Sequence, residues 1–492
     1  MKIAFYTLGC KLNQSESEAL ASGFGSRGFS VINAHESADI YVVSTCTVTS
    51  KAEQKARRMI RKFSRENPLA VIIITGCYVQ LDRDLLENIV DNTFLVSQDH
   101  KDLLLYLPEY LASYGGISVK AGEAEAPTGL KDVVAAFFRQ MSEEAPEHDP
   151  FAFKADTFEY HSRAFLKIQD GCDNHCAYCR VTLARGESFS LPLTDVLERV
   201  ALLEEEGYRE IVLTGINLTS WREPVKVSES ENSGGSEGYR LNFTDMLSRV
   251  LEQVQNTRIR LSSLEPETIT ESLAAVLSHP NLCPHFHISV QSGSNAVLKM
   301  MRRKNNREKI IKGVELLREA CDNPYIAADV IVGFPGETEA DFNESYTLMD
   351  SLQFSELHVF PFSPRPGTAA LDMKNPVPER VTGERTSRMR GLSHRLHDEY
   401  LKSCEDKTFD FILEQPVEKF GTQDGDDRTE KWVGSDTPPE IWYATSGNYL
   451  KLVVKFSSGN IEPSNPPEKG QIVRAKVLSD PEKGYYAQPT TD

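Results

Sequence analysis

Three cysteines stand close together in the segment GCDNHCAYC, where Cys172, Cys176 and Cys179 have the spacing C-x3-C-x2-C. Three thiolates on one tight loop can ligate three irons of a 4Fe–4S cluster and leave the fourth iron without a protein ligand. An iron with an open position is a site for chemistry. A structural zinc site usually takes four ligands, often as pairs of cysteines, so the spacing favours a cluster and leaves zinc as the alternative.

Three further cysteines share another setting, because each follows a short apolar run. Cys10 ends MKIAFYTLGC, Cys46 ends DIYVVSTC and Cys77 ends AVIIITGC. These cysteines are 36 and 31 residues apart, which is the length of a strand and a helix with their loops. Since all strands of a parallel sheet end at the same edge, the three thiols are expected to meet there. The alternative is that they are core residues, because free cysteine packs like a small apolar side chain.

The first 112 residues alternate short apolar runs with segments of helical periodicity, which predicts strand–helix units and a mostly parallel sheet. Gly9 and Gly76 would allow a tight turn and a close backbone approach just before two of the cysteines. The expected strands are 3–8, 40–44 and 71–75, and the expected helices are 15–26, 52–63 and 83–90.

A second α/β region is expected over residues 158–400, after a stretch at 113–157 that lacks periodicity and reads as a linker or insertion. Six strand-and-helix repeats suggest a partial barrel with its site at the carboxyl ends of the strands. The cysteine-rich loop directly follows the first of these strands. The strand candidates are 164–170, 210–216, 258–264, 285–291, 326–334 and 356–362.

The rest of the chain has a different character. Residues 405–480 contain short apolar stretches separated by Gly, Pro and Asp, a pattern typical of a small all-β barrel. Residues 481–492 are expected to form a disordered tail. The predicted fold class is therefore α/β, with a parallel-sheet domain, a partial (β/α)6 barrel and a terminal all-β barrel. A length of 492 residues fits about three domains.

Charge is unevenly distributed along the chain. The net charge of −18 argues against a generally basic nucleic-acid binder. Solvated helix faces are the alternative interpretation of each basic run. Acidic residues gather at 141–149, 227–238 and 422–430, and basic residues gather at 51–66, 302–309 and 385–397.

The location expected for the protein is the cytoplasm. No apolar run reaches the roughly 20 residues of a membrane helix, so no membrane partner is expected. The apolar run after Lys2 is too short for an export signal. Thiols stay reduced in the cytosol, which favours metal binding or catalysis over disulfides for the cysteines.

The C-x3-C-x2-C motif, with Tyr178 just before its last cysteine, resembles that of the radical S-adenosylmethionine enzymes. The resemblance implies a 4Fe–4S cluster and S-adenosylmethionine, which the open iron chelates and from which a 5′-deoxyadenosyl radical is released. Gly215 fits the backbone position that approaches the methionyl amino group. Ordinary strand-end turns are the alternative for the other implied cofactor contacts, which are Ser263, Glu265, Gln291, Asp329 and Gly333.

The order of the three regions is similar to the methylthiotransferase family, whose terminal barrel is an RNA-binding TRAM domain. This resemblance implies that Cys10, Cys46 and Cys77 hold a second 4Fe–4S cluster that carries the sulfur to be inserted. It also implies two uses of S-adenosylmethionine, as the methyl donor and as the radical source. No side chain is therefore predicted as a catalytic acid or base.

Several stretches resemble the family branch that acts on N6-threonylcarbamoyladenosine at position 37, in the anticodon loop of tRNA: TLGCKLNQSESE, STCTVT, TGCYVQ and SELHVFPFS. The resemblance implies tRNA, an electron donor and a sulfur donor as partners. The alternatives are the branch acting on isopentenyladenosine, the branch modifying an aspartate of a ribosomal protein, and a non-enzymatic iron–sulfur module that binds RNA.

Two features depart from the family pattern. Arg180-Val181-Thr182 follows the third motif cysteine, where relatives usually have Ile-Ile-Pro. Cys283, Cys321 and Cys404 fit no ligand spacing, and they are predicted to be packing residues.

Overall fold

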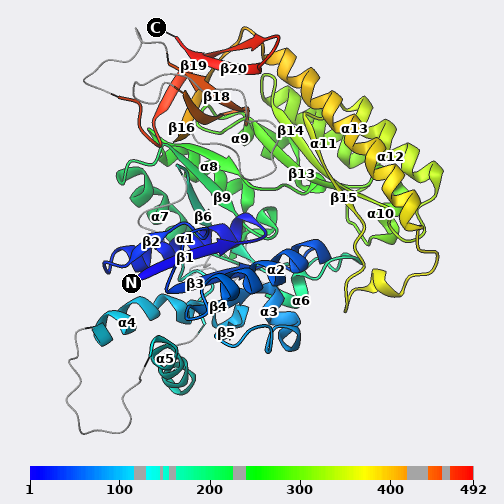
Figure 1. Ribbon diagram of the computed structural model, residues 1–492. Helices are drawn as coiled ribbons and strands as arrows, with labels where there is room; N and C mark the ends of the chain where they lie inside the picture. Colours follow the sequence, from blue (N-terminus) through cyan, green and yellow to red (C-terminus); the bar gives the residue numbers. More distant parts are fainter. Residues whose placement is uncertain are drawn as a thin grey trace, which may run out of the picture.

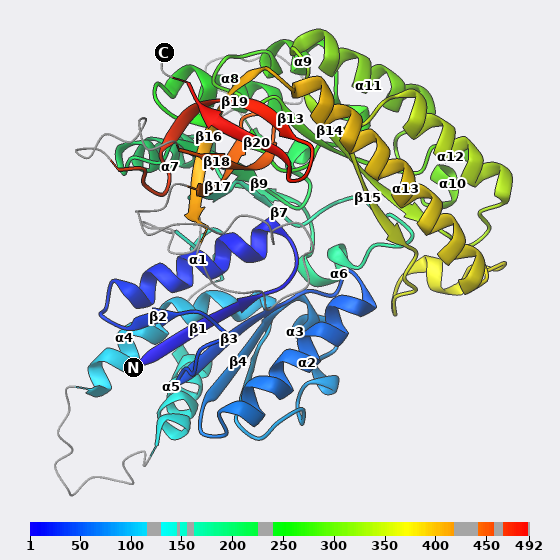
Figure 2. The ribbon, with the colours of Figure 1, turned by 45° about the horizontal axis from the view of Figure 1, so that its top comes forward.

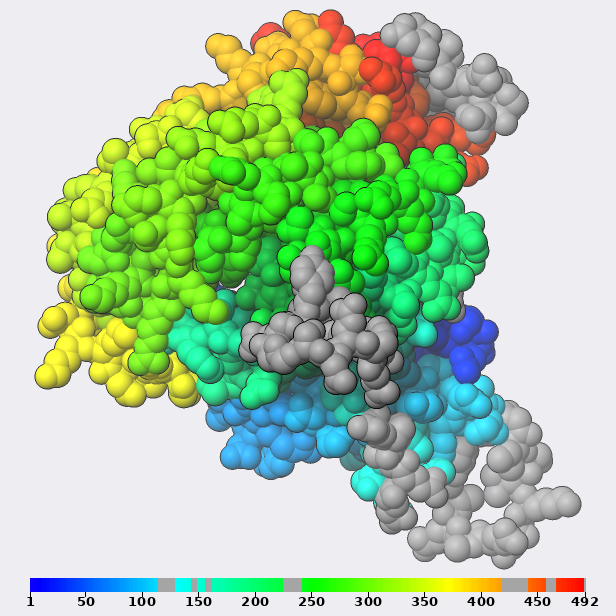
Figure 3. Space-filling view, turned by 180° about the vertical axis from the view of Figure 1, so that it is seen from behind, coloured from blue at the N-terminus to red at the C-terminus, as the bar shows by residue number. Residues whose placement is uncertain are grey.

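The computed structural model describes residues 1–115, 129–144, 148–154, 162–224, 240–417, 441–456 and 466–490. A parallel sheet near the N-terminus, a larger central α/β unit and a small terminal barrel follow one another along the chain (Figure 1). Seen from behind, the central unit lies between the other two (Figure 3). The fold class predicted from the sequence is confirmed.

The N-terminal sheet has five parallel strands in the order β2-β1-β3-β4-β5. The central strands are buried on both faces, which explains their continuous apolar runs. Thr7 pairs with Ser44 and Thr45 pairs with Gly76, so three strands end at one edge. The strands are β1 (Lys2–Thr7), β2 (Ser30–Ile32), β3 (Ile40–Thr45), β4 (Val71–Gly76) and β5 (Thr93–Val96).

Helices cover both faces of this sheet. α1 (Lys11–Gly25) packs Leu20 and Phe24 on one face, and α2 (Ser50–Glu66) packs Ile60 and Phe63 on the other. Shorter helical segments follow β4 and β5: α3 (Cys77–Leu81), η1 (Arg83–Leu85), η2 (Gln98–Leu105) and α4 (Leu107–Gly115). The helix expected over 83–90 is thus a single short turn.

Part of the expected linker at 113–157 is a helix, α5 (Leu130–Glu144), so the expectation of irregular structure is wrong there. Val134 and Phe137 are buried against the face of the sheet that α1 covers. The helix forms because apolar residues recur at helical spacing and bury one stripe. That stripe consists of Leu130, Val133, Val134, Phe137, Phe138 and Met141.

The central unit bends six parallel strands into an open barrel. Two three-stranded sheets, β12-β9-β6 and β13-β14-β15, are joined by parallel bridges from Ile259 to Leu282 and from Leu264 to Ile288. The strands are β6 (Ala164–Lys167), β9 (Glu210–Thr214), β12 (Arg258–Leu261), β13 (His285–Gln291), β14 (Tyr325–Val332) and β15 (Glu356–Pro361).

Helices line the outside of this barrel (Figure 2). The long ones are α7 (Leu193–Glu205), α8 (Phe243–Gln253), α11 (Arg307–Ala320), α12 (Glu339–Ser351) and α13 (Glu379–Cys404). The short helical segments are α6 (Val181–Arg185), η3 (Leu218–Ser220), η4 (Pro266–Thr268), α9 (Glu271–Leu277), α10 (Asn295–Met300) and η5 (Ala369–Asp372). Two short hairpins are β7 (Gln169–Asp170) with β8 (Phe189–Ser190) and β10 (Arg222–Pro224) with β11 (Arg240–Asn242).

The terminal unit is a closed barrel in the order β16-β17-β18-β20-β19. Within the expected tail at 481–492, residues 484–489 instead form a strand, because β20 pairs with β19 and places Ala487 opposite Val477 in the barrel core. The acidic stretches at 227–238 and 422–430 lie outside the described residues. The strands are β16 (Thr408–Pro416), β17 (Ile441–Ser446), β18 (Lys451–Lys455), β19 (Ile472–Asp480) and β20 (Gly484–Pro489).

Buried arginines attach the terminal barrel to the central unit. Arg260 of β12 is fully buried, donates to Glu210 at 2.6 Å, and donates to the carbonyls of Ser446 and Gly447 at 2.9 and 3.0 Å. These arginine contacts hold the pKa of the Glu210 carboxyl well below its usual range, although burial alone would raise it. Over the described part of the chain, no helix is both long and apolar enough to cross a membrane.

Candidate functional site

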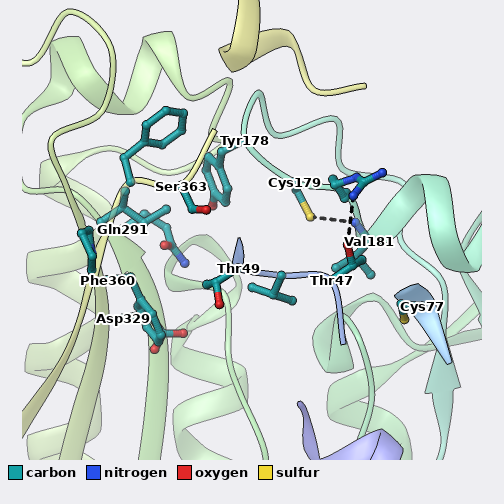
Figure 4. Close-up of a pocket in the computed structure, with 15 residues that line it drawn as sticks. Thr47, Thr49, Cys77, Tyr178, Cys179, Val181, Gln291, Asp329, Phe360 and Ser363 are labelled. Atoms are coloured by element: carbon teal, nitrogen blue, oxygen red, sulfur yellow. Dashed lines mark hydrogen bonds between the residues drawn. The ribbon is translucent and has the colours of Figure 1, made fainter. Parts of the chain in front are cut away.

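A cavity of about 210 Å³ lies where the carboxyl edge of the N-terminal sheet faces the open end of the central barrel (Figure 4). It contains Cys77 from the first cysteine triplet and Cys179 from the second. The fold therefore brings together two sets of thiols that are about one hundred residues apart in the chain. The N-terminal sheet contributes Thr47, Val48, Thr49 and Cys77, and the central unit contributes Tyr178, Cys179, Arg180, Val181, Gln291, Asp329, Ile331, Phe360, Pro361, Phe362 and Ser363.

The first triplet lies at the three strand ends predicted from the sequence. Cys10 is exposed at the start of α1, whereas Cys46 after β3 and Cys77 at the start of α3 are buried. Gly9 has a φ of +105°, and a Cβ there would lie 2.7 Å from Cys46 Cβ. Gly76 has a φ of +100°, and a Cβ there would lie 2.4 Å from the Thr45 carbonyl oxygen. Glycine is therefore needed at both positions for these strand ends to approach.

The electrostatics of the first triplet suit a bound cation. Burial, and then the neighbouring Cys10 thiol, raise the pKa of Cys46 to about 12. The Cys10 and Cys77 thiolates therefore oppose ionisation of Cys46, and a cationic group must compensate before Cys46 can ionise beside them.

The second triplet lies on the loop between β7 and α6, and donors point at its sulfurs. The backbone N–H of Asn174 donates to Cys172 Sγ at 3.4 Å, and the backbone N–H of Val181 donates to Cys179 Sγ at 3.4 Å. Asn217 Nδ2 lies 3.8 Å from Cys172 Sγ. Such contacts stabilise thiolate character on the sulfur, which is what an iron ligand requires.

Among the described residues, no three His, Cys, Asp or Glu side chains converge as ligands of a single metal ion would. A 4Fe–4S cluster does not need such convergence, because each of its thiolates binds a different iron. The donor set of each triplet can therefore ligate a cluster.

Two family models match the chain: the uncharacterized protein family UPF0004 over residues 2–97 and the radical SAM superfamily over residues 166–349. Threonylcarbamoyladenosine tRNA methylthiotransferase MtaB of Treponema pallidum is 37% identical over 460 residues, which cover 85% of this chain and 92% of that protein. The chain belongs to the radical SAM methylthiotransferase family. It is thus an enzyme, and membership in this family implies S-adenosylmethionine and a 4Fe–4S cluster as cofactors.

Other relatives show the breadth of the family. MtaB of Bacillus subtilis is 34% identical over 97% of this chain and 93% of that protein. The tRNA-2-methylthio-N(6)-dimethylallyladenosine synthase of Syntrophotalea carbinolica is 31% identical over 81% of this chain and 85% of that protein. Among solved structures, the radical S-adenosylmethionine methyltransferase TsrM of Kitasatospora setae matches with a TM-score of 0.48 at 14% identity, over 75% of this chain and 73% of that one.

Two of the predicted cofactor contacts of this methylthiotransferase line the cavity. Gln291 ends β13 with a φ of +67°, an unusual conformation for a residue other than glycine, and its amide points into the cavity (Figure 4). Asp329 also lines it and is hydrogen-bonded at 2.8 Å to Nε2 of His287. A ligand in the cavity could therefore contact both Gln291 and Asp329.

The other predicted contacts have different surroundings. Glu265 pairs with Arg303, whose Nη1 lies 3.6 Å from Cys176 Sγ, so it sits beside the second triplet. A Cβ at Gly215 would lie 2.9 Å from Gln169 Oε1. Ser263 is half-buried two residues beyond β12.

Gly333 lies against the long helix α13. A Cβ at Gly333 would lie 2.4 Å from Thr382 Oγ1 of α13. Its N–H donates to Glu337 Oε2 at 2.8 Å, so this glycine serves the packing of α13 on β14.

The sequence reasoning missed two arginines that cross between the units. Arg180 donates to Asp82 at 2.8 Å and to Thr47 Oγ1 at 2.9 Å, the latter drawn in Figure 4. Arg365 is buried and pairs with Glu53. The only trace of this role in the sequence was the departure from the family pattern at position 180.

A third missed arginine joins a buried charge cluster beside the first triplet. Arg185 donates to Asp170 at 2.8 Å and to Glu16 at 3.2 Å, while Lys101 and Lys167 reach Glu16 at 2.6 and 2.9 Å. Three cations against two carboxylates leave one net positive charge. Burial raises the pKa of the Cys77 thiol, and Arg185 is the main influence that opposes this rise. The excess cation therefore favours thiolate at the first triplet.

The remaining cysteines pack as predicted. Cys283 and Cys404 are 2% and 0% exposed, and Cys321 packs against the core of the central unit.

Proposed function

We propose that this enzyme methylthiolates C2 of N6-threonylcarbamoyladenosine at position 37 in the anticodon loop of tRNA. The product would be 2-methylthio-N6-threonylcarbamoyladenosine. The observation that carries the proposal is the single cavity reached by both cysteine triplets. The names of the Treponema and Bacillus relatives support this nucleoside as the substrate.

In this proposal the two triplets have separate tasks. Cys172, Cys176 and Cys179 hold one 4Fe–4S cluster, and Cys10, Cys46 and Cys77 hold a second. A cluster with an open iron, together with S-adenosylmethionine, supplies a carbon radical that can take a hydrogen atom from an unreactive C–H bond. The C2–H of adenine is not acidic, so the chain needs no side chain as general base.

The chain's own contribution is to orient the reactants and to exclude water. Gln291 and Asp329 offer polar atoms on the barrel side of the cavity, where S-adenosylmethionine would bind, with Gly215, Ser263 and Glu265 nearby as further contacts. Apolar side chains, among them Val48, Ile331 and Phe360, line the cavity, and a bound nucleotide would cover the exposed Val48 and Phe360 and so keep water from the reacting carbon. We assign Gly333 to the support of this pocket rather than to direct contact.

We further propose three working domains, at 1–112, 158–400 and 405–480, with α5 added to the first and β20 to the last. The terminal barrel resembles a TRAM domain and would hold the RNA. An electron donor and a sulfur donor complete the partners, and the cytoplasm is the proposed location.

Mass spectrometry of tRNA nucleosides from cells that lack this enzyme tests the proposal. We expect 2-methylthio-N6-threonylcarbamoyladenosine to disappear and to return with the wild-type gene, but not with Cys176→Ala or Cys46→Ala. An unchanged level of this nucleoside, with loss of a 2-methylthio-dimethylallyl or isopentenyl nucleoside instead, would contradict it. Loss of a methylthio group from a ribosomal protein alone would also contradict it.

A further inference from the structure

The outer face of α2 is strongly basic in a chain whose net charge is −18. We call this the α2 surface and define it by five side chains that line one groove with Tyr6 and His35. Among the described residues, these five cations have no acidic partner. They are Lys55, Arg58, Arg61, Lys62 and Arg65.

The acidic residues of α2 do not neutralise this surface. Of the two acidic residues of α2, Glu53 is buried on the inner side of the helix, where it pairs with Arg365 and accepts a hydrogen bond from Thr47 at 2.6 Å. Glu66 is the last residue of the helix and forms no ion pair among the described residues. Arg58 and Lys62 are four residues apart, as are Arg61 and Arg65, and like charges at this spacing repel each other along a helix. A bound polyanion would relieve that repulsion.

The two other basic runs of the sequence are used in part within the fold. In the run 385–397, Arg385 pairs with Glu337 at 2.8 Å and Arg395 pairs with Asp350 at 2.7 Å. In the run 302–309, Arg303 pairs with Glu265, whereas Arg302, Lys304 and Lys309 have no acidic partner among the described residues. The α2 surface differs in carrying five such cations on one helix.

The helix that carries the α2 surface begins at the rim of the cavity. Thr49, the N-cap of α2, lines the cavity, and Ser50 contacts Ser363 of the central unit with 3.3 Å between their hydroxyl oxygens. α2 has 17 residues, and at about 1.5 Å per residue it extends roughly 25 Å from the rim. A strand whose reacting base enters the cavity would thus have its flanking backbone within reach of these cations.

We propose that the α2 surface binds the phosphate backbone beside the reacting nucleotide of the substrate RNA. This inference rests on the proposed function, because it takes RNA as the substrate. Two aromatic rings, Tyr6 and His35, line the groove, and Tyr6 packs edge-on against Phe63 at 5.6 Å between ring centres. The five cations outnumber these rings, and Lys and Arg contacts to phosphates give affinity and register without reading sequence.

The test compares wild-type holoenzyme with the triple variant Arg58→Gln, Arg61→Gln, Lys62→Gln. The probe is tRNA carrying N6-threonylcarbamoyladenosine, and the dissociation constant is measured over about 50 to 200 mM salt. We expect the affinity for tRNA to fall about tenfold. The slope of log K against log salt should shrink by about 2, because each of the three lost phosphate contacts contributes roughly 0.7. The triple variant should be impaired in binding tRNA, so saturating tRNA should restore much of its turnover.

The matched control removes the same charge elsewhere, with Arg209→Gln, Arg249→Gln and Lys402→Gln on exposed positions of the central unit. The control should bind tRNA as tightly as the wild type. Both triple variants should have the melting temperature and the iron content of the wild type. Wild-type affinity and salt slope in the α2 variant would overturn the proposal while leaving the proposed function intact. Slower cluster reduction by an acidic redox protein, with tRNA binding unchanged, would assign the surface to that partner instead. Failure of the wild-type enzyme to bind or modify this tRNA would instead contradict the proposed function.

Discussion

Cys172, Cys176 and Cys179 lie on one loop of eight residues, whereas Cys10, Cys46 and Cys77 come from three strand ends of a sheet. Local contacts arrange the loop set, since Asn174 and Val181 lie within two residues of the sulfurs to which they donate. The strand-end set exists only once β1, β3 and β4 are paired in register. One set is therefore a property of a short segment, and the other is a property of the fold.

The largest expected effect separates the two sets by chemistry. Cys176→Ala should abolish both S-adenosylmethionine cleavage and methylthiolation. Cys46→Ala should abolish methylthiolation and keep cleavage, because the loop set would remain complete. The measurement is 5′-deoxyadenosine formation together with iron content, which should fall from about eight to about four per chain in each variant. Cys321→Ala is the control, and equal loss of cleavage in both cysteine variants would refute the separation.

The next largest effect concerns the Arg180–Asp82 ion pair, which joins the N-terminal sheet to the central unit. Arg180→Ala leaves Asp82 without its cation at the boundary, and loss of one partner of a largely buried pair costs about 3 kcal/mol of unfolding free energy. Both sets should still load iron, but product should form more slowly than S-adenosylmethionine is cleaved. Arg395→Ala removes an exposed pair and should cost less than about 1 kcal/mol. Denaturant unfolding and the ratio of product to 5′-deoxyadenosine report the result, and a normal ratio in Arg180→Ala would count against coupling.

A backbone change should damage the strand-end set alone. Gly76→Ala adds both left-handed strain and a clash with the Thr45 carbonyl, so we expect a cost of about 2 to 4 kcal/mol and loss of iron from the first triplet. Gly28→Ala has a similar φ of +82° with no atom within 4 Å, and it should cost about 1 to 2 kcal/mol. Chemical denaturation and iron analysis of the two variants decide the matter. Equal iron content would show that the strand ends tolerate the displacement.

The smallest expected effect lies in the loop set. Asn217→Ala removes one donor from Cys172 Sγ, and a lost donor destabilises the more negative, reduced form of the cluster. Iron content should stay unchanged, and the reduction potential should move slightly lower in a redox titration followed by electron paramagnetic resonance. A higher potential would show that Asn217 does not act through this sulfur.

The same contrast explains what could be read from the sequence. Local patterns in the sequence predicted the loop motif. Because β3 and β4 are buried on both faces, they are continuous apolar runs in the sequence, and the cysteines at their ends could be recognised from these runs. Helix α5 was missed because a Gly- and Pro-rich stretch surrounds its apolar stripe. Strand β20 was missed because GYYAQP has no apolar run, and only closure of the barrel fixes its pairing.

The charged groups around the site were beyond local reasoning. Arg180 and Arg185 stand in a loop and a short helix, where charged residues are usually exposed. Their partners are 98 and 169 residues away in the chain, at Asp82 and Glu16. Such pairs are fixed by how the two units dock, which no window of sequence contains.

The buried ion pairs between the N-terminal sheet and the central unit also affect how ligands reach the cavity. Parting the two units would separate Arg180 from Asp82 and Arg365 from Glu53, and it would leave Arg185 with Asp170 alone; each stranded charge costs several kcal/mol. A conformer with the units swung apart is thus very rarely populated. S-adenosylmethionine would then enter the cavity, and its products would leave it, while the two units stay docked.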